Sequence, residues 1–396
     1  MKNKKNIIIG FIGFLFLFIV EMLIALQILP VVKIDKPSIK INEKNINYKI
    51  TIKETRQILP FFKQHKRKDI SNKEEIIISN AENIDLSITN IIKENYILYI
   101  YKDDIELYSG QPLEDLSMIL NSNGKYKVLL IDNFKESFRE IELSYEFDIV
   151  VNVETKISIE KNSFKKGDII FLQIDNVVSN NIVVTSSISE TKKYKCIKNG
   201  YSCQAMIPIS IDDNVGKEFI TVKIDKKEKV LEFNIEEVST SEYLENKETI
   251  NEYNKELIKT VKQLILNDDI VFNNKFEIPS NAKLFMRFGG KIINSNIYIQ
   301  MDRLKYTENY NVVAINNGII LAAKTSPIFG NYIIIDHGNN ILSFYGNLSI
   351  MNVKENETIE KGKNIGKTEN SEDSYLDFAI FLDNVLVNPE NFVIYE

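Results

Sequence analysis

Hydrophobic and polar residues alternate along most of the chain, in short runs of the kind that form β-strands. Between residues 46 and 151 these runs are bounded by Asn, Asp, Gly and Ser. A period of two places the apolar side chains on one face of a strand. Strands at this spacing, with little helical sequence between them, predict a β-sandwich. The runs are 46–52, 75–88, 96–104, 124–132 and 139–151.

A second series of strand patterns, between residues 156 and 224, predicts another sandwich that ends near Glu236. At its centre, Cys196 and Cys203 stand symmetrically about Asn199-Gly200, the dipeptide favoured in type I′ hairpin turns. That turn predicts residue 196 directly opposite residue 203, within reach of a disulfide bond. Two unpaired thiols are the alternative. The strand patterns are 156–174, 181–188, 204–211 and 216–224.

The pattern changes to a helical period after residue 239. Ser239 and Glu242 have the spacing of a capping box. The apolar positions that follow recur at intervals of three and four, and they predict one amphipathic helix of about 25 residues within 239–268. The apolar stripe consists of Ile250, Tyr253, Leu257, Val261, Leu264 and Ile265.

The N-terminus holds one long apolar run, residues 7–29, preceded by Lys2, Lys4 and Lys5. A run of this length can cross a bilayer as a helix, and the lysines predict a cytoplasmic N-terminus. We therefore expect a single-pass protein of the cell membrane with residues 31–396 on the extracytoplasmic, periplasmic side. A cleaved signal peptide is the alternative, disfavoured by the length of the run and the lack of an Ala-x-Ala site.

Composition narrows the possible partners. The net charge of −6 is spread evenly, which argues against nucleic acid, because neutralising phosphates requires clustered Lys and Arg. The one basic run, residues 62–69, is predicted to be a solvated loop, with contact to a polyanion as the alternative.

The predicted fold class is mostly β, in a chain of 396 residues of which 44% are hydrophobic. The expected parts are a cytoplasmic tip with a transmembrane helix (1–30), two β-sandwiches (38–151 and 152–236), a linking helix (239–268) and a C-terminal β-sheet domain (272–396).

Residues 272–396 carry a series of motifs in a fixed order that resembles the LytM/lysostaphin-type zinc endopeptidases, which cut peptide crosslinks in peptidoglycan. The second sandwich is similar to the immunoglobulin-like domain that precedes many membrane-associated members. The resemblance implies a LytM-like sheet with a groove for an extended peptide. The motifs are "FEIP" with "RFGG" (276–290), "VVAINNGII" (312–320), "GNYIIIDHGNNILSFYGNLS" (330–349), "VKENETIEKGKNIG" (353–366) and "VNPENFV" (387–393).

The resemblance also implies where zinc should bind. Family members hold it with a His-x-x-x-Asp pair and the second histidine of a His-x-His motif, and two further histidines assist the attacking water. Here Asp302 is kept, but Tyr298, Asn347, Tyr375 and Asp377 stand at the other positions. A catalytic zinc needs about three protein ligands and an open position. We therefore expect that zinc is lost and that no residue is catalytic.

Neither of the two histidines restores the site. His337 matches the Asp-His-Gly turn of the family, outside the metal set, and is expected to be a structural turn residue that hydrogen-bonds the backbone. His65 lies in the basic run. If the fold is kept, Asp302 and Asp377 should face each other across the former zinc position, where solvated carboxylates are favoured over a calcium or magnesium site.

In this family, loss of the zinc ligands with the groove retained implies a binding role, in which the domain activates or positions a separate cell-wall hydrolase such as an amidase. We therefore expect a membrane-anchored, non-catalytic LytM-like protein that scaffolds or regulates peptidoglycan hydrolysis in cell-wall remodelling or division. Its expected partner is peptidoglycan or such a hydrolase. An active metalloendopeptidase with an atypical metal site, or a structural envelope-binding protein, are the alternatives. Whether the linking helix covers the groove stays open.

Overall fold

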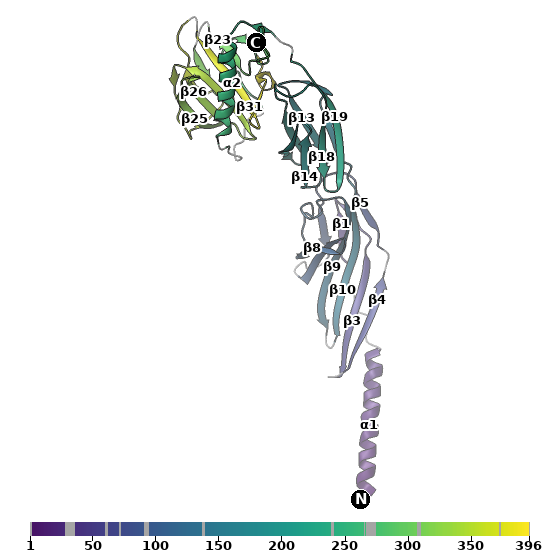
Figure 1. Ribbon diagram of the computed structural model, residues 1–396. Coiled ribbons are helices and arrows are strands. Elements are labelled where there is room, and N and C mark those ends of the chain that lie inside the picture. The colour runs from purple at the N-terminus through teal and green to yellow at the C-terminus, as the bar shows by residue number, and fades with distance from the viewer. Residues whose placement is uncertain are drawn as a thin grey trace. The chain divides into compact units, whose positions relative to one another are not determined.

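The computed structural model is built mostly of β-strands, with two α-helices in the part of the chain that it describes (Figure 1). The chain forms two compact units, one of residues 1–155 with 176–180 and the other of residues 156–175 with 181–396. The described residues are 2–27, 36–59, 62–70, 73–90, 95–136, 139–238, 241–264, 266, 275–306, 310–371 and 374–395.

The apolar N-terminal run is helical, because α1 spans Lys2–Gln27. Residues 28 and 29 of the predicted segment lie outside the described residues. Over the part of the chain that the structure describes, no helix is both long enough and apolar enough to cross a membrane. The membrane-spanning interpretation of residues 7–29 is therefore not confirmed.

The first unit is built on a seven-stranded sheet of order β4-β3-β10-β9-β7-β8, with β5 paired to β10, and on a three-stranded sheet of order β2-β1-β6. Alternate side chains of β10 are buried, as its period of two predicts. Their bounds are β1 (Ser38–Ile41), β2 (Lys44–Asn45), β3 (Lys49–Leu59), β4 (Phe62–Ile70), β5 (Glu75–Ile78), β6 (Leu86–Thr89), β7 (Tyr96–Lys102), β8 (Ile105–Gly110), β9 (Gly124–Glu136) and β10 (Arg139–Val151).

The basic run at residues 62–69 is a strand, so its prediction as a loop was wrong. β4 pairs with β3 from Ile50 opposite Ile70 to Leu59 opposite Phe62. Backbone hydrogen bonds to β3 hold it at the sheet edge, while most of its side chains stay in solvent. Hydropathy did not reveal the strand because it buries little apolar surface.

The second unit begins with two sheets, of order β11-β13-β17-β16 and β12-β19-β18-β14-β15. Leu172, Ile207, Val222 and Phe233 are among the buried residues of these sheets. The strands are β11 (Lys156–Ile159), β12 (Ser163–Lys165), β13 (Ile169–Asp175), β14 (Ile182–Ser186), β15 (Ser189–Tyr194), β16 (Ile197–Asn199), β17 (Ser202–Pro208), β18 (Gly216–Ile224) and β19 (Lys227–Glu236).

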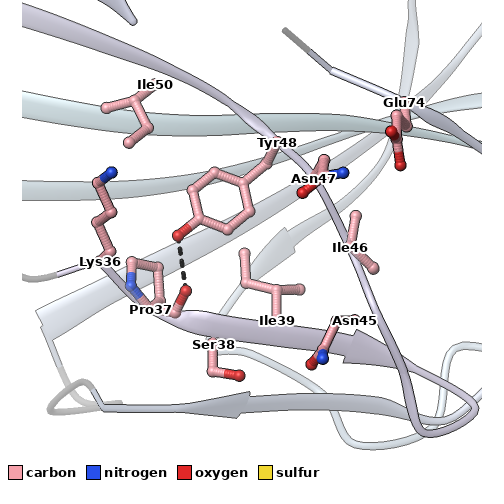
Figure 2. Close-up of a pocket in the computed structure, with 10 residues that line it drawn as sticks. All are labelled: Lys36, Pro37, Ser38, Ile39, Asn45, Ile46, Asn47, Tyr48, Ile50 and Glu74. Atoms are coloured by element: carbon pink, nitrogen blue, oxygen red, sulfur yellow. Dashed lines mark hydrogen bonds between the residues drawn. The ribbon is translucent and has the colours of Figure 1, made fainter. Parts of the chain in front are cut away.

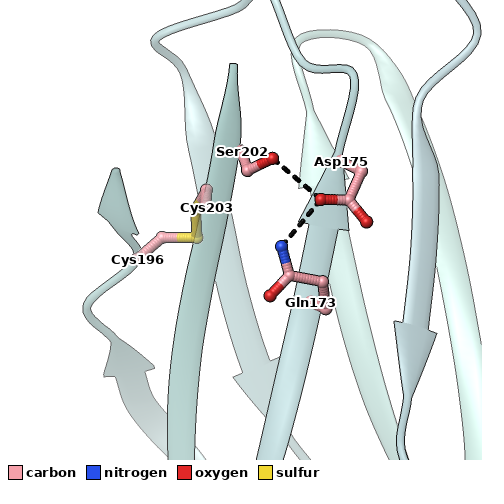
Figure 3. The surroundings of a disulfide bond; sticks show 5 residues. All are labelled: Gln173, Asp175, Cys196, Ser202 and Cys203. Carbon is pink, nitrogen blue, oxygen red and sulfur yellow. Dashed lines mark hydrogen bonds between the residues drawn. A yellow bond between two sulfur atoms is a disulfide. The ribbon is translucent and has the colours of Figure 1, made fainter. Parts of the chain in front are cut away.

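A disulfide bond joins Cys196 and Cys203, whose Cα atoms lie 5.6 Å apart (Figure 3). The predicted pairing is wrong by two residues, because Lys198 pairs with Cys203 instead of Tyr201, and Asn199 pairs with Ser202. The turn therefore consists of Gly200 and Tyr201. Gly200 has φ +58° at the first central position, where type II′ turns favour glycine. Cys196 precedes β16 and reaches its partner diagonally.

The C-terminal domain holds an eight-stranded sheet of order β21-β23-β31-β27-β26-β25-β29, with β32 paired to β31. A three-stranded sheet (β24-β30-β28) and the pair β20-β22 accompany it. The strands are β20 (Glu242–Tyr243), β21 (Lys283–Met286), β22 (Lys291–Ile292), β23 (Asp302–Lys305), β24 (Asn311–Val313), β25 (Gly318–Ser326), β26 (Gly330–Asp336), β27 (Ile341–Leu348), β28 (Ile350–Met351), β29 (Thr358–Ile359), β30 (Asn364–Lys367), β31 (Tyr375–Leu382) and β32 (Val385–Val387).

The linking helix is shorter than predicted. α2 spans Lys247–Lys262, 16 residues, and Asn246 caps it by accepting a hydrogen bond from the Thr249 N–H. The predicted cap, Ser239, lies outside the described residues, and its expected partner Glu242 belongs to β20. The predicted apolar stripe is correct for Ile250, Tyr253, Leu257 and Val261, which are buried.

The two parts of the second unit share a packed boundary. The carbonyl of Gly167 accepts hydrogen bonds from the Asn388 N–H (2.8 Å) and the Asn391 side-chain amide (2.9 Å). Lys192 donates to the carbonyl of Asp383 at 2.9 Å. Ile169 of β13 is buried in the same core cluster as Leu304 of β23.

Candidate functional site

The pairing of β23 with β31 determines which residues at the zinc positions expected from the family come together. Arg303 of β23 lies directly opposite Asp377 of β31, and Asp302 lies opposite Phe378. Directly paired residues point to the same face of a sheet, and consecutive residues point to opposite faces. Asp302 and Asp377 therefore lie on opposite faces, and the expectation that they face each other was wrong.

Asp377 is bound by an arginine. The Arg303 Nε donates to Oδ1 of Asp377 at 2.8 Å and Nη2 donates to Oδ2 at 3.3 Å, a two-pronged ion pair. The side chains are 12% and 3% exposed. Burial lowers the pKa of the Arg303 guanidinium, but the charge and hydrogen bond of Asp377 together raise that pKa above its ordinary value. Arg303 is therefore a permanent cation at this site.

The guanidinium has further contacts. It lies over the ring of Tyr375, 4.1 Å from the ring centroid, in cation–π geometry. Nη1 lies 3.8 Å from a carboxylate oxygen of Glu245 and 3.8 Å from the sulfur of Met286. Burial, followed by the charge of Asp377, raises the pKa of Tyr375 above its ordinary value, so its hydroxyl stays neutral.

Helix α2 lies across this face of the sheet (Figure 1). Its buried side chains belong to the same core cluster as Phe344 of β27 and Phe381 of β31. The hydroxyl of Tyr253 reaches Gly346, where an added Cβ would lie 3.0 Å from it. Burial and then the charge of Asp377 raise the pKa of Tyr253 well above its ordinary value. The helix thus places a neutral, buried phenol beside Asp377.

Two asparagine side chains donate hydrogen bonds to the backbone at the expected site positions. Asn254 of α2 donates to the carbonyl of Tyr298 at 2.8 Å. Asn347 donates to the carbonyl of Tyr375 at 3.0 Å and has a positive φ of 60°. These bonds connect α2 to the backbone at Tyr298 and β27 to the backbone at Tyr375.

Asp302, on the other face, holds the C-terminal segment. Its Oδ1 accepts from the Phe288 N–H at 2.8 Å, and its Oδ2 accepts from the Tyr395 hydroxyl at 2.7 Å. Only 1% of the residue is exposed. Burial raises the pKa of Asp302 to about 6, against the opposing effect of its two hydrogen bonds.

His337 is fully buried, and its ring is held between two oxygens. Nδ1 lies 2.7 Å from the carbonyl of Asn317, and Nε2 lies 2.7 Å from Oγ of Ser343. Burial lowers the pKa of His337 to about 4, so the ring is neutral at ordinary pH. These contacts are those of a structural histidine inside the turn.

The residues present do not fit a zinc ion. Among the described residues, no three His, Cys, Asp or Glu side chains gather as a metal centre requires. Asp377 directs its carboxylate to Arg303, and Asp302 points away from it. The buried guanidinium of Arg303, which lies near the carboxylates of Asp377 and Glu245, would repel a metal cation.

A separate hollow lies in the first unit, between β1 and β3 (Figure 2). It encloses about 530 Å³ and is open to solvent on one side. The Tyr48 hydroxyl donates to the Pro37 carbonyl at 2.6 Å across it. Lys36 and Glu74 are the charged side chains that line it.

Comparison with known proteins identifies the C-terminal domain. Residues 302–389 match the model of Peptidase family M23. The chain thus carries an M23 peptidase family domain in its C-terminal part, in the region that resembles the LytM/lysostaphin enzymes.

Two curated proteins are similar to parts of this chain. Stage II sporulation protein Q of Bacillus subtilis (strain 168) is 29% identical over 91 residues, which cover 22% of this chain and 32% of that protein. Peptidoglycan DD-endopeptidase ShyA of Vibrio cholerae is 33% identical over 55 residues, which cover 14% and 13%. The chain thus spans about a third or less of each relative's length.

Among solved structures, a putative peptidase M23 from Pseudomonas aeruginosa aligns with a TM-score of 0.43 and 15% identity. The alignment covers 59% of this chain and 95% of that chain.

Sequence reasoning missed three residues of the site: Arg303, Tyr253 and Tyr395. Arg303 could have been found, because it directly follows Asp302 on a strand and must point to the other face. Tyr253 was recognised only as part of an apolar stripe. No sequence signal connects Tyr395 to Asp302, since 93 residues separate them.

Proposed function

We propose that this protein is a non-catalytic M23-family protein that scaffolds or regulates peptidoglycan hydrolysis. The observation that carries the proposal is the buried Arg303–Asp377 pair, because the family resemblance puts Asp377 at a ligand position and a fixed cation is bound to its carboxylate. A guanidinium has no exchangeable ligand position and cannot activate water as zinc does.

The cover formed by α2 supports the same proposal. Substrate cleavage requires an extended peptide to reach the reacting centre, but Tyr253 and Leu257 pack against that face of the sheet. A binding role needs no open centre, because rims and sheet edges can hold a partner. The partner that we propose is peptidoglycan itself or a cell-wall hydrolase such as an amidase.

The decisive experiment is muropeptide release from purified sacculi by the purified full-length chain, with and without added zinc. We expect no release above buffer in either case, and a changed rate of release when the chain is added to a separate N-acetylmuramoyl-L-alanine amidase. Release by the chain alone that disappears in Asp377→Asn would overturn the proposal. Release that Asp377→Asn leaves unchanged would indicate a contaminating hydrolase.

We also propose that residues 31–396 act outside the cytoplasm. The disulfide between Cys196 and Cys203 supports an oxidising compartment, and the lysines before the apolar run support a cytoplasmic N-terminus. Protease added to intact spheroplasts should digest the chain. Full protection, with digestion only after lysis, would refute this location.

A further inference from the structure

β4 is an open sheet edge with exposed side chains. It is the last strand of the seven-stranded sheet, and within the described residues it pairs with β3 alone. From Lys63 to Asp69 every side chain is exposed except Gln64, which is half-buried. An edge strand offers a row of unpaired backbone N–H and C=O groups to another chain.

The edge is strongly basic and largely uncompensated. It carries Lys63, Lys66, Arg67 and Lys68 against one acid, Asp69. Asp69 is already engaged by Arg67 and by Lys49, each at 3.3 Å. In the described part of the chain, Lys66 and Lys68 make no ion pair. The acidic residues near this edge form ion pairs with cations outside β4. These pairs are Glu54–Arg56, Glu142–Lys53 and Glu140–Lys135.

The cations flank the open edge on both faces. Arg67 lies opposite Lys53, and His65 lies opposite Thr55, on the outer face of the sheet. Lys66 lies opposite Glu54, and Lys68 lies opposite Ile52, on the core side. A chain laid along the edge would therefore meet positive charge from both sides.

Lysines on an edge strand can also serve to block unwanted pairing. The other edge of the same sheet, β8, argues that the lysines of β4 do not serve only to block unwanted strand pairing. β8 carries one charged residue, Glu106, and exposes Ile105 (65%) and Leu107 (44%). The charge is thus concentrated on one edge of the sheet, and the other edge is left apolar.

We propose that β4 is a docking edge for an extended acidic peptide segment of a partner protein, which adds to the sheet as a further strand. The unpaired backbone groups supply a ladder of hydrogen bonds, and the lysines on both faces select for carboxylates. A phosphate polymer would use the lysines but not the backbone groups, so the geometry favours a peptide.

The test uses the full-length chain and a short peptide with a Glu-Glu-Val repeat, which carries carboxylates on both faces of a strand. A Gln-Gln-Val peptide is the matched control. We expect binding of the acidic peptide that weakens with added salt, together with slowed amide exchange along residues 62–70. Lys66→Glu with Lys68→Glu should weaken binding about tenfold or more. Lys226→Glu with Lys227→Glu, the same charge change at exposed positions of the second unit, should not.

Three outcomes would overturn the proposal. The first is the absence of binding, which would leave the lysines as protection of the edge. The second is equal binding of both peptides. The third is binding of polyphosphate or of phosphatidylglycerol vesicles as tightly as the peptide with no change in amide exchange along β4, which would indicate a general polyanion surface.

Discussion

At the scale of single residues, Arg303 is a buried cation bound to Asp377, which the family resemblance predicts at a zinc-ligand position. Unlike a metal, it is attached to the chain, and its two-pronged bond to Asp377 uses both carboxylate oxygens. Burying two charges costs desolvation free energy, which their attraction offsets only when the geometry is good. Removing one partner leaves the other charge buried and unpaired.

We therefore expect Arg303→Ala to lower the free energy of unfolding by about 3–5 kcal/mol, as for other broken buried pairs. Replacing both partners, in Arg303→Met with Asp377→Met, should recover much of the loss. Arg287→Ala, which removes a cation that is 56% exposed, should cost about 1 kcal/mol or less. Urea denaturation measures all three. Equal losses for Arg303→Ala and Arg287→Ala would contradict the role of the buried pair.

The buried carboxyl group of Asp302 makes the stability of the protein depend on pH. Its folded-state pKa of about 6 lies above the ordinary value of 3.8, so the folded state binds the proton more tightly than the unfolded state does. The contribution of this group to stability is full below pH 4 and is lost as pH rises to about 6. The loss amounts to about 3 kcal/mol.

The variant Asp302→Asn has no proton to lose and keeps the shape of the side chain. The stability of the variant minus that of the wild type should therefore rise between pH 4 and pH 7 and then stay constant. His337, whose pKa is lowered to about 4, destabilises both proteins as pH falls from 6.5, and it cancels in the difference. Denaturation at several pH values provides the check. A pH-independent difference would show that Asp302 titrates normally.

At the scale of elements, the central strands of the C-terminal sheet lack the alternation seen in β10. β27 and β31 are buried on both faces, because α2 covers one face and a second core cluster fills the other. The sequence of such strands is a continuous apolar run. α2 packs on the sheet through one apolar stripe, and most of its polar side chains face solvent.

We expect Leu257→Ala, in the middle of that stripe and fully buried, to cost about 2–5 kcal/mol, since a cavity remains under the helix. Lys255→Ala, on the exposed side of the same turn, should change stability by about 0.5 kcal/mol or less. Thermal unfolding of the two variants gives the comparison. A small effect of Leu257→Ala would mean that α2 leaves the sheet at little cost.

At the scale of the whole molecule, the second unit joins a two-sheet part and the M23 domain through the region of Gly167. This residue has φ +87°, and an added Cβ would lie 2.3 Å from the ring of Phe288. Gly200 also has a positive φ, +58°, but an added Cβ would meet nothing within 4 Å. Comparing substitutions at these two glycines therefore distinguishes the cost of backbone strain from the cost of a steric clash at the boundary.

We expect Gly167→Ala to destabilise the second unit more than Gly200→Ala, which bears only the backbone cost of about 1 kcal/mol. Because the boundary is shared, both parts of the second unit should unfold together, in one calorimetric transition that Gly167→Ala lowers. The transition of the first unit should not move. Separate transitions for the two-sheet part and the M23 domain would show that the boundary carries little free energy.

The amino-acid sequence alone determined the local elements and the number of histidines, two in the whole chain. Strands β10 and β18 begin and end where alternation predicted, because a period of two is a local property of the chain. The face on which Asp302 and Asp377 each lie, the pairing of Asp377 with Arg303 and the covering helix were decided by tertiary structure. Side-chain direction in a sheet depends on register with distant strands, and a one-residue shift reverses it.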